Sequence, residues 1–249
     1  MPLHLIFLFR SRPDMTRARF LEHWAVRHAL LVAALPQVRA YVRNVIAPVA
    51  APSQPWQGVE ELWVDDERAA DELFASEAWR RGPLADESNF VDTKAVLRLR
   101  VSDHAVIAGV PIARDETLPK RMTFFRHKPG TTRGEALHYW RHQHGPLAAS
   151  APGVRRYVQS TVAADEANGS PFDGVAQIWL ESDAALGALA ASALFRERIK
   201  PDEANFVAVE HNLTLAVHEQ REVWPAQAGA IACANVDAAQ MRRGAGSEE

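Results

Sequence analysis

Apolar and polar residues follow two different periods along the chain, in an order that predicts six elements. An apolar run at 3–9 is short enough for a strand, and beyond it apolar residues recur at spacings of three and four, as on one side of a helix. Alternation with a period of two then returns twice, followed by a second helical stretch and a last alternating run. The predicted order is strand, helix, strand, strand, helix, strand, at 3–9, 17–35, 38–46, 58–65, 66–74 and 95–101.

The whole order recurs 116 residues further along the chain. Between Phe9 and Ala47, 16 of 39 positions are identical to those of Phe125 to Ala163, which is far above chance. The helix stripe, the proline that ends it and the strand that follows all return, and the matched pairs include Trp24/Trp140, His28/His144, Pro36/Pro152 and Tyr41/Tyr157. A repeat of this length indicates a duplicated domain rather than a solenoid.

Each copy therefore predicts a ferredoxin-like βαββαβ unit, an α+β fold in which both helices lie on one face of an antiparallel sheet. The other face of the sheet needs a cover, and in a duplicated chain the other copy is the simplest one. We expect the two sheets to pack face to face as a barrel within one chain, with the helices outside. The predicted domains are 1–112 and 117–222, with 223–249 as a peripheral C-terminal segment.

Composition adds limits on the class of protein. Hydrophobic residues make up 47% of the chain, enough for a large core, and a net charge of −3 argues against nucleic acid or an anionic membrane as the main partner. The one cysteine, Cys233, cannot form an internal disulfide, the N-terminus lacks the features of a signal peptide, and no apolar run approaches a membrane span. We expect a cytoplasmic protein that binds a small molecule.

Three motifs resemble the EthD family. They are Tyr-Trp-x-x-x-His-Gly-Pro-Leu at 139–147, Pro-Gly-Val-Arg-Arg-Tyr at 152–157, and Asp-Glu-x-Asn-Phe-Val at 86–91 and 202–207. The resemblance covers about 1–220 as two fused domains. It implies the dimeric α+β barrel superfamily, whose members include cofactor-independent oxygenases, decarboxylases, dehydratases, lactone isomerases and haem-degrading enzymes. The first copy departs from the pattern, with His23 in place of Tyr139, so we expect the second copy to keep the better site.

Two repeated histidines are the candidates for catalysis. His144 and His28 could each exchange a proton with a substrate, because imidazole titrates near neutral pH and needs no cofactor. The structural alternative is a histidine near the C-terminal end of a helix, where the helix dipole favours it. Trp140 and Trp24 lie on the same stripe and are either packing residues or part of a pocket for a planar ligand.

Alternation along the strands predicts a second set of candidates, which faces into the barrel. The residues expected to face inward are, from the second strand of each unit, Arg39, Tyr41, Arg43, Arg155, Tyr157 and Gln159, and, from the third, Glu61, Trp63, Gln177 and Trp179. We expect the tyrosines and tryptophans, with Arg39 and Arg155, to bind the substrate. Glu61 is a candidate general acid or base among aromatic walls, or else half of a salt bridge with Arg39 between the two half-barrels.

Arg126 and its counterpart Arg10 follow the first strand of each unit. Either could hold a substrate carboxylate through a bidentate pair. We prefer the structural interpretation, with Arg10 bound to Asp86 and Arg126 bound to Asp202.

Metal and cofactor sites find little support in the sequence. His138 and His142 have the spacing of zinc ligands, but they fall on the side of the helix away from the apolar stripe, which indicates a solvated face. No nucleotide, flavin or serine-hydrolase motif is present. We expect no cofactor and no metal.

These residues predict a cofactor-independent enzyme that moves protons on a small aromatic, lactone or polyketide-like acid, by decarboxylation, dehydration or isomerisation. Two alternatives stay open from the sequence: a cofactor-free or haem-dependent monooxygenase of the same superfamily, and a non-catalytic accessory protein that binds a ligand. Since one chain supplies both half-barrels, we expect a monomer with an internal pseudo-dimer, or a homodimer formed through the outer helices.

Overall fold

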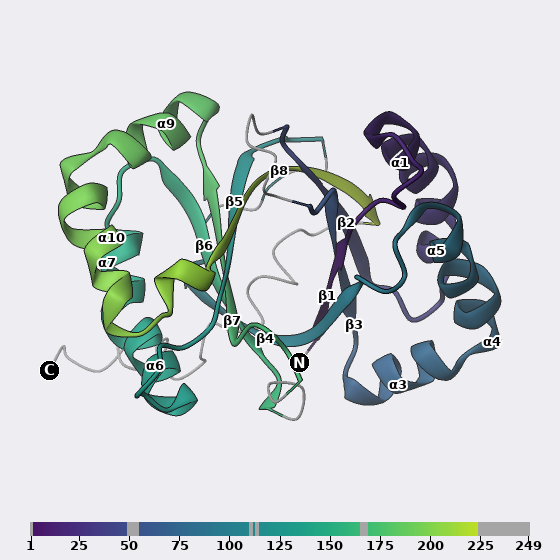
Figure 1. Cartoon of the computed structure of the whole chain (residues 1–249), viewed down its shortest axis with the longest axis horizontal. Helices are drawn as coiled ribbons and strands as arrows, with labels where there is room; N and C mark the ends of the chain where they lie inside the picture. The colour runs from purple at the N-terminus through teal and green to yellow at the C-terminus, as the bar shows by residue number, and fades with distance from the viewer. Residues whose placement is uncertain (1, 49–54, 110–111, 113–114, 165–168, 224–249) are drawn as a thin grey trace, which may run out of the picture.

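Each copy forms the predicted four-stranded antiparallel sheet, with its helices on the outer face (Figure 1). The computed structural model describes residues 2–48, 55–109, 112, 115–164 and 169–223. Within these ranges the two sheets join into one closed barrel, in the strand order β1-β3-β2-β8-β5-β7-β6-β4. Figure 1 shows the two helical layers on opposite sides of this barrel, one from each copy. The predicted intramolecular barrel is therefore confirmed, whereas the predicted C-terminal segment lies outside the described residues from 224 onward.

The strands are β1 (Leu3–Phe9), β2 (Ala40–Ile46), β3 (Gly58–Val64), β4 (Leu97–Ile107), β5 (Pro119–Phe125), β6 (Val154–Val162), β7 (Gly174–Leu180) and β8 (Leu213–Val223). The barrel closes where β2 pairs with β8 and β4 pairs with β6. Both β4 and β8 run beyond their predicted ends, because the added residues pair with a strand of the other unit. Periodicity within one unit carries no signal for that pairing.

The helical segments of the first unit are α1 (Arg17–His23), η1 (Trp24–His28), α2 (Ala29–Ala33), α3 (Glu67–Ala75), α4 (Glu77–Trp79), η2 (Arg80–Leu84) and α5 (Ala85–Phe90). Those of the second unit are α6 (Arg133–Tyr139), η3 (Trp140–His144), α7 (Gly145–Ala149), α9 (Asp183–Ala191), η4 (Phe195–Ile199), α10 (Lys200–Asp202), η5 (Glu203–Asn205) and η6 (Val209–His211). None of the helices in the described ranges is both long and apolar enough to cross a membrane.

Two predicted helical features differ in the structure. The first helix of each unit, predicted as continuous, contains a π-helical turn at η1 or η3 that begins at the tryptophan and ends at the histidine. The wider turn keeps these two side chains, four residues apart, on the side that faces the sheet. The Asp-Glu-x-Asn-Phe-Val motif, which lies outside the six predicted elements, is helical in α5 and in α10 with η5.

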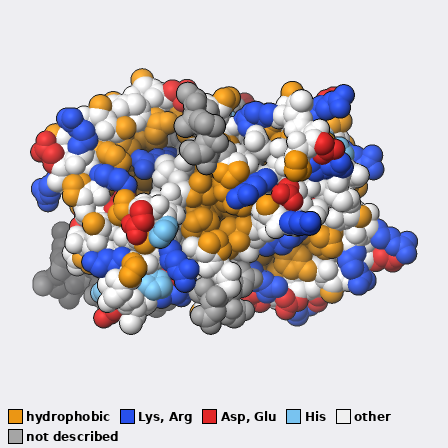
Figure 2. Space-filling view, viewed as in Figure 1, with side chains coloured by type: hydrophobic (Ala, Val, Ile, Leu, Met, Phe, Trp, Pro, Cys, Tyr) orange, Lys and Arg blue, Asp and Glu red, His pale blue; other side chains and the backbone are white. Residues whose placement is uncertain are grey.

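Alternate strand residues build two kinds of core. On the outer faces, residues such as Phe7 and Phe9 pack against Trp24 and Phe90 of the helical layer. On the inner faces, one end of the barrel is filled by apolar side chains from both units: Ile6, Leu8, Ile46, Val59, Leu99, Val101, Met122, Phe124, Val162, Phe172, Val175, Leu215 and Val217. Figure 2 shows apolar groups gathered in the middle of one face of the molecule, between charged helical flanks.

Two glycines at the start of β3 and β7 allow the indole rings to approach the backbone of the sheet closely. A Cβ atom on Gly58 would lie 2.2 Å from Cζ3 of Trp24, and one on Gly174 would lie 2.9 Å from Cζ3 of Trp140. We expect Gly58→Ala to lower the free energy of unfolding by about 1–3 kcal/mol, measured by urea denaturation, because the ring must shift in a packed core. Gly134→Ala is the control, since nothing lies within 4 Å of its added Cβ atom. Equal losses in the two variants would contradict this packing.

Candidate functional site

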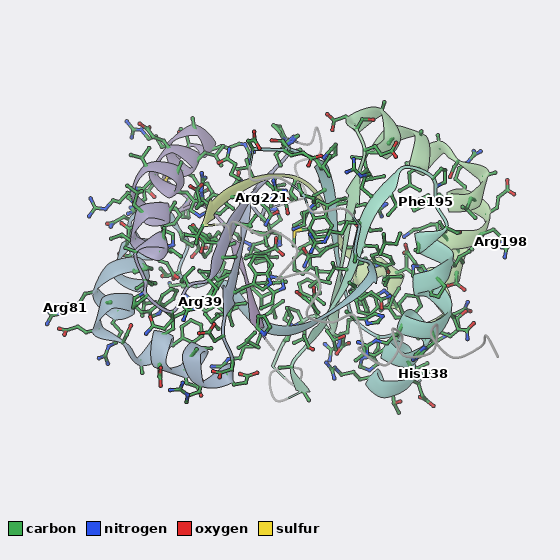
Figure 3. All side chains as sticks on the ribbon, turned by 180° about the vertical axis from the view of Figure 1, so that it is seen from behind. Arg39, Arg81, His138, Phe195, Arg198 and Arg221 are labelled. Carbon is green, nitrogen blue, oxygen red and sulfur yellow. The ribbon has the colours of Figure 1, made fainter. Side chains whose placement is uncertain are left out.

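A pocket of about 600 Å³, including the open space at its mouth, lies in the second unit between the outer face of the sheet and the helices. Apolar side chains form most of its lining, among them four aromatic residues: Phe125, Trp140, Phe195 and Phe206. Figure 3 shows Phe195 on the helical layer of this unit, beside the sheet. The polar lining residues are Arg121, Thr123, His144, Tyr157, Glu203 and Asn212. An apolar pocket with a few polar groups suits a small flat ligand with polar substituents.

His144 lies at this pocket, at the end of the π-helical turn. Its Nδ1 is 2.8 Å from Oδ2 of Asp202, while Tyr139 and Asn205 donate to the other carboxylate oxygen at 2.7 and 2.9 Å. Burial acts to raise the pKa of Asp202, but the hydrogen bonds from Tyr139, His144 and Asn205 outweigh it and hold that pKa below its usual range. An ionised Asp202 keeps the proton of His144 on Nδ1. The other nitrogen, Nε2, has no hydrogen-bond partner among the described residues and is therefore an available base.

Tyr157 presents a hydroxyl group to the same pocket. This oxygen accepts hydrogen bonds from Nε1 of Trp140 and from Nε2 of Gln159, both at 3.2 Å. Burial raises the pKa of Tyr157 to about 12, so the hydroxyl stays protonated. With both contacts accepted, its own proton is available for donation to a ligand oxygen.

Arg121 supplies the pocket with a positive charge that we did not predict from the sequence. Its guanidinium lies 5.4 Å from the centre of the Phe195 ring, and its Nε is buried without a hydrogen-bond partner in the described part of the chain. Burial lowers the pKa of Arg121. Glu203, the acid in the same lining, has its carboxylate 2.5 Å from Lys200. Comparison of the two copies could have revealed Arg121. Its counterpart in the first unit is Leu5, so a cation replaces an apolar residue at a strand position that faces the helices.

In the first unit, a carboxylate of the chain itself occupies the corresponding place. Oε1 of Glu60 accepts hydrogen bonds from Nε1 of Trp24 at 2.7 Å and from the hydroxyl of Tyr41 at 2.5 Å, and it lies 3.5 Å from Nε2 of His28. Burial acts to raise the pKa of Glu60, but His28 outweighs it and the pKa falls below its usual value. The counterpart of Glu60 in the second unit is Ala176, a residue of the pocket lining. In the second unit the indole N–H of Trp140 donates to Tyr157 instead, so the tyrosine proton and Nε2 of His144 are left open to a ligand.

Larger side chains fill the rest of this space in the first unit. The lining residues Thr123, Ala148, Ala151 and Phe195 correspond to four bulkier and buried residues, Phe7, Val32, Leu35 and Trp79. The rings of Phe7 and Trp79 contact each other with their centres 6.2 Å apart. At each of these positions the smaller side chain in the second unit leaves volume that the larger side chain in the first unit occupies.

The inner face of the barrel carries a separate polar cluster. Glu61 faces inward, as predicted, and lies 2.5 Å from Nζ of Lys120 and 3.2 Å from His4. Burial acts to raise the pKa of Glu61, but Lys120 and His4 hold it far below its usual range. Glu61 therefore forms a salt bridge between the half-barrels, but its partner is Lys120 and not the predicted Arg39. Trp63, Gln177 and Trp179 also face inward, in agreement with the alternation of the third strands.

Comparison with known proteins places this arrangement in a family. The EthD domain matches the chain twice, at residues 12–94 and 128–210. The chain belongs to the EthD family. No curated protein matches it by sequence. The two EthD units coincide with the two ferredoxin-like sheets, so the repeat, the fold and the family agree.

Solved structures share the barrel of the tandem EthD protein at low sequence identity. An anthrone oxidase-like protein has a TM-score of 0.63 and 15% identity, over 89% of this chain and 93% of that chain. A protein from Fusobacterium nucleatum, provisionally named a monooxygenase, has a TM-score of 0.59 and 8% identity, over 88% and 92%. One from Lactobacillus acidophilus, with the same provisional name, has a TM-score of 0.52 and 10% identity, over 88% and 94%. At these identities the comparison shows the fold alone.

The predicted direction of the second strands is wrong. Tyr41 and Arg43 face the helices of the first EthD unit, and Tyr157 and Gln159 face those of the second. The predicted alternation starts at Val38, whereas β2 begins only at Ala40. The same phase error arises in β6 from a register shift between Val154 and Arg156. The two tyrosines therefore belong to the outer cores, where Tyr157 contributes to the pocket after all.

The predicted arginines lie away from the EthD pocket. Arg39 is exposed and pairs with Asp65 at 2.6 Å, and Arg155 is half-buried with Glu116 4.0 Å away. Arg10 stacks over Trp56 rather than binding Asp86, and Arg126 is exposed. The motif acids that we had paired with Arg10 and Arg126 instead bind the helix histidines. The structure thus brings together His144, Trp140 and Tyr157, but not Arg39, Arg126 or Arg155.

His138 and His142 are both exposed, as expected for a solvated helix face, with ring centres 4.4 Å apart. Figure 3 shows His138 on the helical layer of the second EthD unit. Within the described residues, no group of three or more histidine, cysteine, aspartate and glutamate side chains is arranged to hold a metal ion.

Two buried histidines predict how stability depends on pH. Burial acts to lower the pKa of His28 and His4, but carboxylates outweigh it, chiefly Glu60 for His28 and Asp103 for His4, and raise each pKa to about 9. Because the folded pKa lies above the unfolded value of 6.5, the stabilisation is complete below about pH 6.5 and is lost as the pH rises through about 9. We expect a loss on the order of 3 kcal/mol per histidine between pH 6 and 10, measured by urea denaturation.

The variant His28→Gln should show a smaller loss of stability over the same pH range than the unmodified protein, and the exposed His138→Gln should show the same loss. A stability that does not change between pH 6 and 10 would contradict the charged state of these buried pairs.

Proposed function

We propose that the second EthD unit is a cofactor-independent acid–base catalyst that acts on a small aromatic or lactone-type acid in the pocket at His144. One observation carries this proposal. The chain's own Glu60 fills in the first unit the place that lies open beside Ala176 in the second. A substrate oxygen at that place would meet the groups that hold Glu60 in the first unit.

The charge of the reacting substrate has suitable partners there. An enolate or carboxylate oxygen beside Ala176 could accept the proton of the Tyr157 hydroxyl and lie near Nε2 of His144. Arg121, half-buried and without an ion pair in the described ranges, could hold a second anionic group of the same molecule. Preorganised donors of this kind stabilise the negative charge that develops when a carbon loses a proton.

Proton transfer follows from the His144–Asp202 pair. Nε2 of His144 accepts the proton from a substrate carbon, the C–H bond breaks, and its electron pair moves onto the substrate oxygen. Asp202 stabilises the imidazolium that forms. Return of the proton to another carbon completes an isomerisation, and its delivery to a departing hydroxide, which leaves as water, completes a dehydration. In a decarboxylation the C–C bond to the carboxylate breaks with loss of CO₂, and the carbanion takes a proton that solvent water delivers through Nε2 of His144, leaving hydroxide.

Oxygenation is a second candidate, favoured by the names of the similar structures. A substrate carbanion in this pocket could react with O₂, the co-reactant. A methylene carbon would lose both hydrogens and keep one oxygen atom as a carbonyl, while the other oxygen atom leaves as water. The anthrone oxidase-like protein and the two provisionally named monooxygenases share the barrel on which this chemistry would be built.

One panel of aromatic acids, hydroxy acids and lactones separates these reactions. Product formation under argon, with or without CO₂ release, supports the acid–base proposal, whereas product formation that requires O₂ and consumes it favours the oxygenase. If panel members bind in calorimetry and none is turned over, the acid–base and the oxygenase proposals are both contradicted. That result would indicate a non-catalytic carrier.

Arg121 predicts a preference for anionic ligands. We expect Arg121→Gln to raise the Kd of an aromatic carboxylate about tenfold or more, measured by calorimetry, because a charged hydrogen bond in an apolar pocket is lost. The corresponding neutral amide should bind both forms alike. Arg198→Gln, at an exposed residue of the helical layer of the second unit, is the control (Figure 3). An equal loss of affinity for acid and amide would show that Arg121 does not recognise the charge.

A further inference from the structure

A second cavity lies inside the barrel at its polar end, with a volume of about 390 Å³ including the space at its mouth. Both units line it, through β2, β3 and β4 of the first and β6, β7 and β8 of the second, together with Ile112 of the joining segment. Figure 3 shows one lining residue, Arg221, in the middle of the molecule between the helical layers. The sheet of the second unit separates this cavity from the pocket at His144, because the two open on opposite faces of β6 and β7.

Arg156 is a buried cation in this cavity. Its side chain is 8% exposed, its guanidinium lies 4.9 Å from the centre of the Trp179 ring, and its Nε has no hydrogen-bond partner among the described residues. No ion pair of Arg156 is found in the same ranges. Asp103 and Glu219 line the same cavity without contacting Arg156 directly. Burying a guanidinium without an anion in direct contact is unfavourable, so its retention here points to a further partner.

Two further polar groups of the same lining are also unsatisfied. Nε1 of Trp179 and Oε1 of Gln177 are buried and lack hydrogen-bond partners in the described part of the chain. The orientation of the Gln177 amide follows from its neighbours. Ser160 donates to Asp103 at 2.6 Å, so its oxygen must accept the 3.0 Å hydrogen bond from Nε2 of Gln177. This leaves Oε1 of Gln177 as an acceptor that needs a donor.

The acids around the cavity do not require Arg156, because each has another basic partner. The pairs are Lys120 with Glu61 at 2.5 Å, Lys120 with Glu219 at 3.0 Å, Arg221 with Glu219 at 2.5 Å, and His4 with Asp103 at 3.0 Å. Four basic side chains, counting Arg156, therefore face three acidic ones in the described part of this end. One positive charge remains for an incoming anion.

We propose that this cavity is a binding site for a small hydroxycarboxylate, separate from the pocket at His144. The carboxylate accepts from the guanidinium of Arg156 and the indole N–H of Trp179, and the hydroxyl group donates to Oε1 of Gln177. A carboxylate without a hydroxyl group would leave the Gln177 oxygen unsatisfied. Because both units build the site, its ligand bridges the two half-barrels.

Calorimetry on the full chain with glycolate and acetate tests the proposal. Glycolate is expected to bind more tightly than acetate, and Arg156→Gln is expected to weaken glycolate about tenfold or more. The melting temperature of Arg156→Gln should not fall, because the variant removes a buried charge that the described chain leaves unpaired. Trp179→Phe keeps the ring, loses one donor, and should weaken glycolate by a smaller factor.

Two matched variants locate the binding. Arg155→Gln, at the half-buried residue next to Arg156, and Arg198→Gln, at an exposed residue of the helical layer of the second unit, should both bind glycolate as the unmodified protein does. The absence of glycolate binding, or equal binding by the unmodified protein and Arg156→Gln, would overturn the proposal. A lower melting temperature for Arg156→Gln together with unchanged glycolate affinity would make Arg156 a structural residue. None of these outcomes depends on the reaction at His144.

Discussion

His144→Ala is expected to lower the turnover of any substrate of this protein by about 10²–10⁴-fold, because it removes the only proton-transfer group that we assign to the pocket. The folded protein should lose only about 1 kcal/mol, since Asp202 is half-buried and keeps the hydrogen bonds from Tyr139 and Asn205. Steady-state kinetics and urea denaturation measure the two effects separately.

His28→Ala is the matched variant, because it changes the counterpart of His144 in the other unit. There the buried carboxylates of Glu60 and Asp86 lose their shared partner, and we expect a loss of about 3–5 kcal/mol in the free energy of unfolding. Turnover per folded molecule should stay within about twofold of the unmodified protein, since His28 and its two carboxylates do not line the pocket of the second unit. Equal losses of turnover in both variants would refute the division of roles between the units.

Ala176→Glu is expected to abolish ligand binding in the second unit without a loss of stability. It gives the second unit the carboxylate that Glu60 supplies to the first, where three neighbouring groups already hold such a side chain. The new carboxylate should fill the place of the substrate oxygen, and affinity for an aromatic acid should fall by about 100-fold or more through steric and charge exclusion.

The same variant has a signature that does not depend on activity. The ring signals of His144, followed by NMR, should shift, because the new carboxylate would lie beside Nε2 as Glu60 lies 3.5 Å from Nε2 of His28. Ala176→Ser is the control, because a small hydroxyl group leaves the pocket open. An Ala176→Glu protein that still binds aromatic acids, with unchanged ring signals of His144, would rule out the proposed position of the substrate oxygen.

The fold could be predicted because its signals are local and repeated. The proline after each helix, the alternation of β3 and β7, and the identities at a shift of 116 residues each depend on neighbours in sequence. The extension of β4 and β8 was missed because it depends on pairing between units. The phase of β2 was missed because Val38 precedes the strand, so its position carries no information about the direction of Tyr41.

The candidate site was harder to predict, because it is defined by differences between the copies rather than by their shared motif. The motif histidine is present in both units, yet only His144 lies at an open pocket. What distinguishes the units is Ala176 opposite Glu60, Thr123 opposite Phe7 and Arg121 opposite Leu5. Single-residue size and charge decide whether a cavity exists, and neither leaves a mark on the periodicity of a strand.

A crystal structure of the protein with a bound aromatic carboxylate tests the central claim most directly, namely that the second unit keeps a working pocket and the first has filled its own. We predict the ligand in the second unit, with one oxygen beside Ala176 within hydrogen-bonding distance of Tyr157 or Nε2 of His144. At the corresponding place in the first unit, the carboxylate of Glu60 should remain. A ligand bound between the sheet and helices of the first unit, with the second pocket empty, would contradict the account.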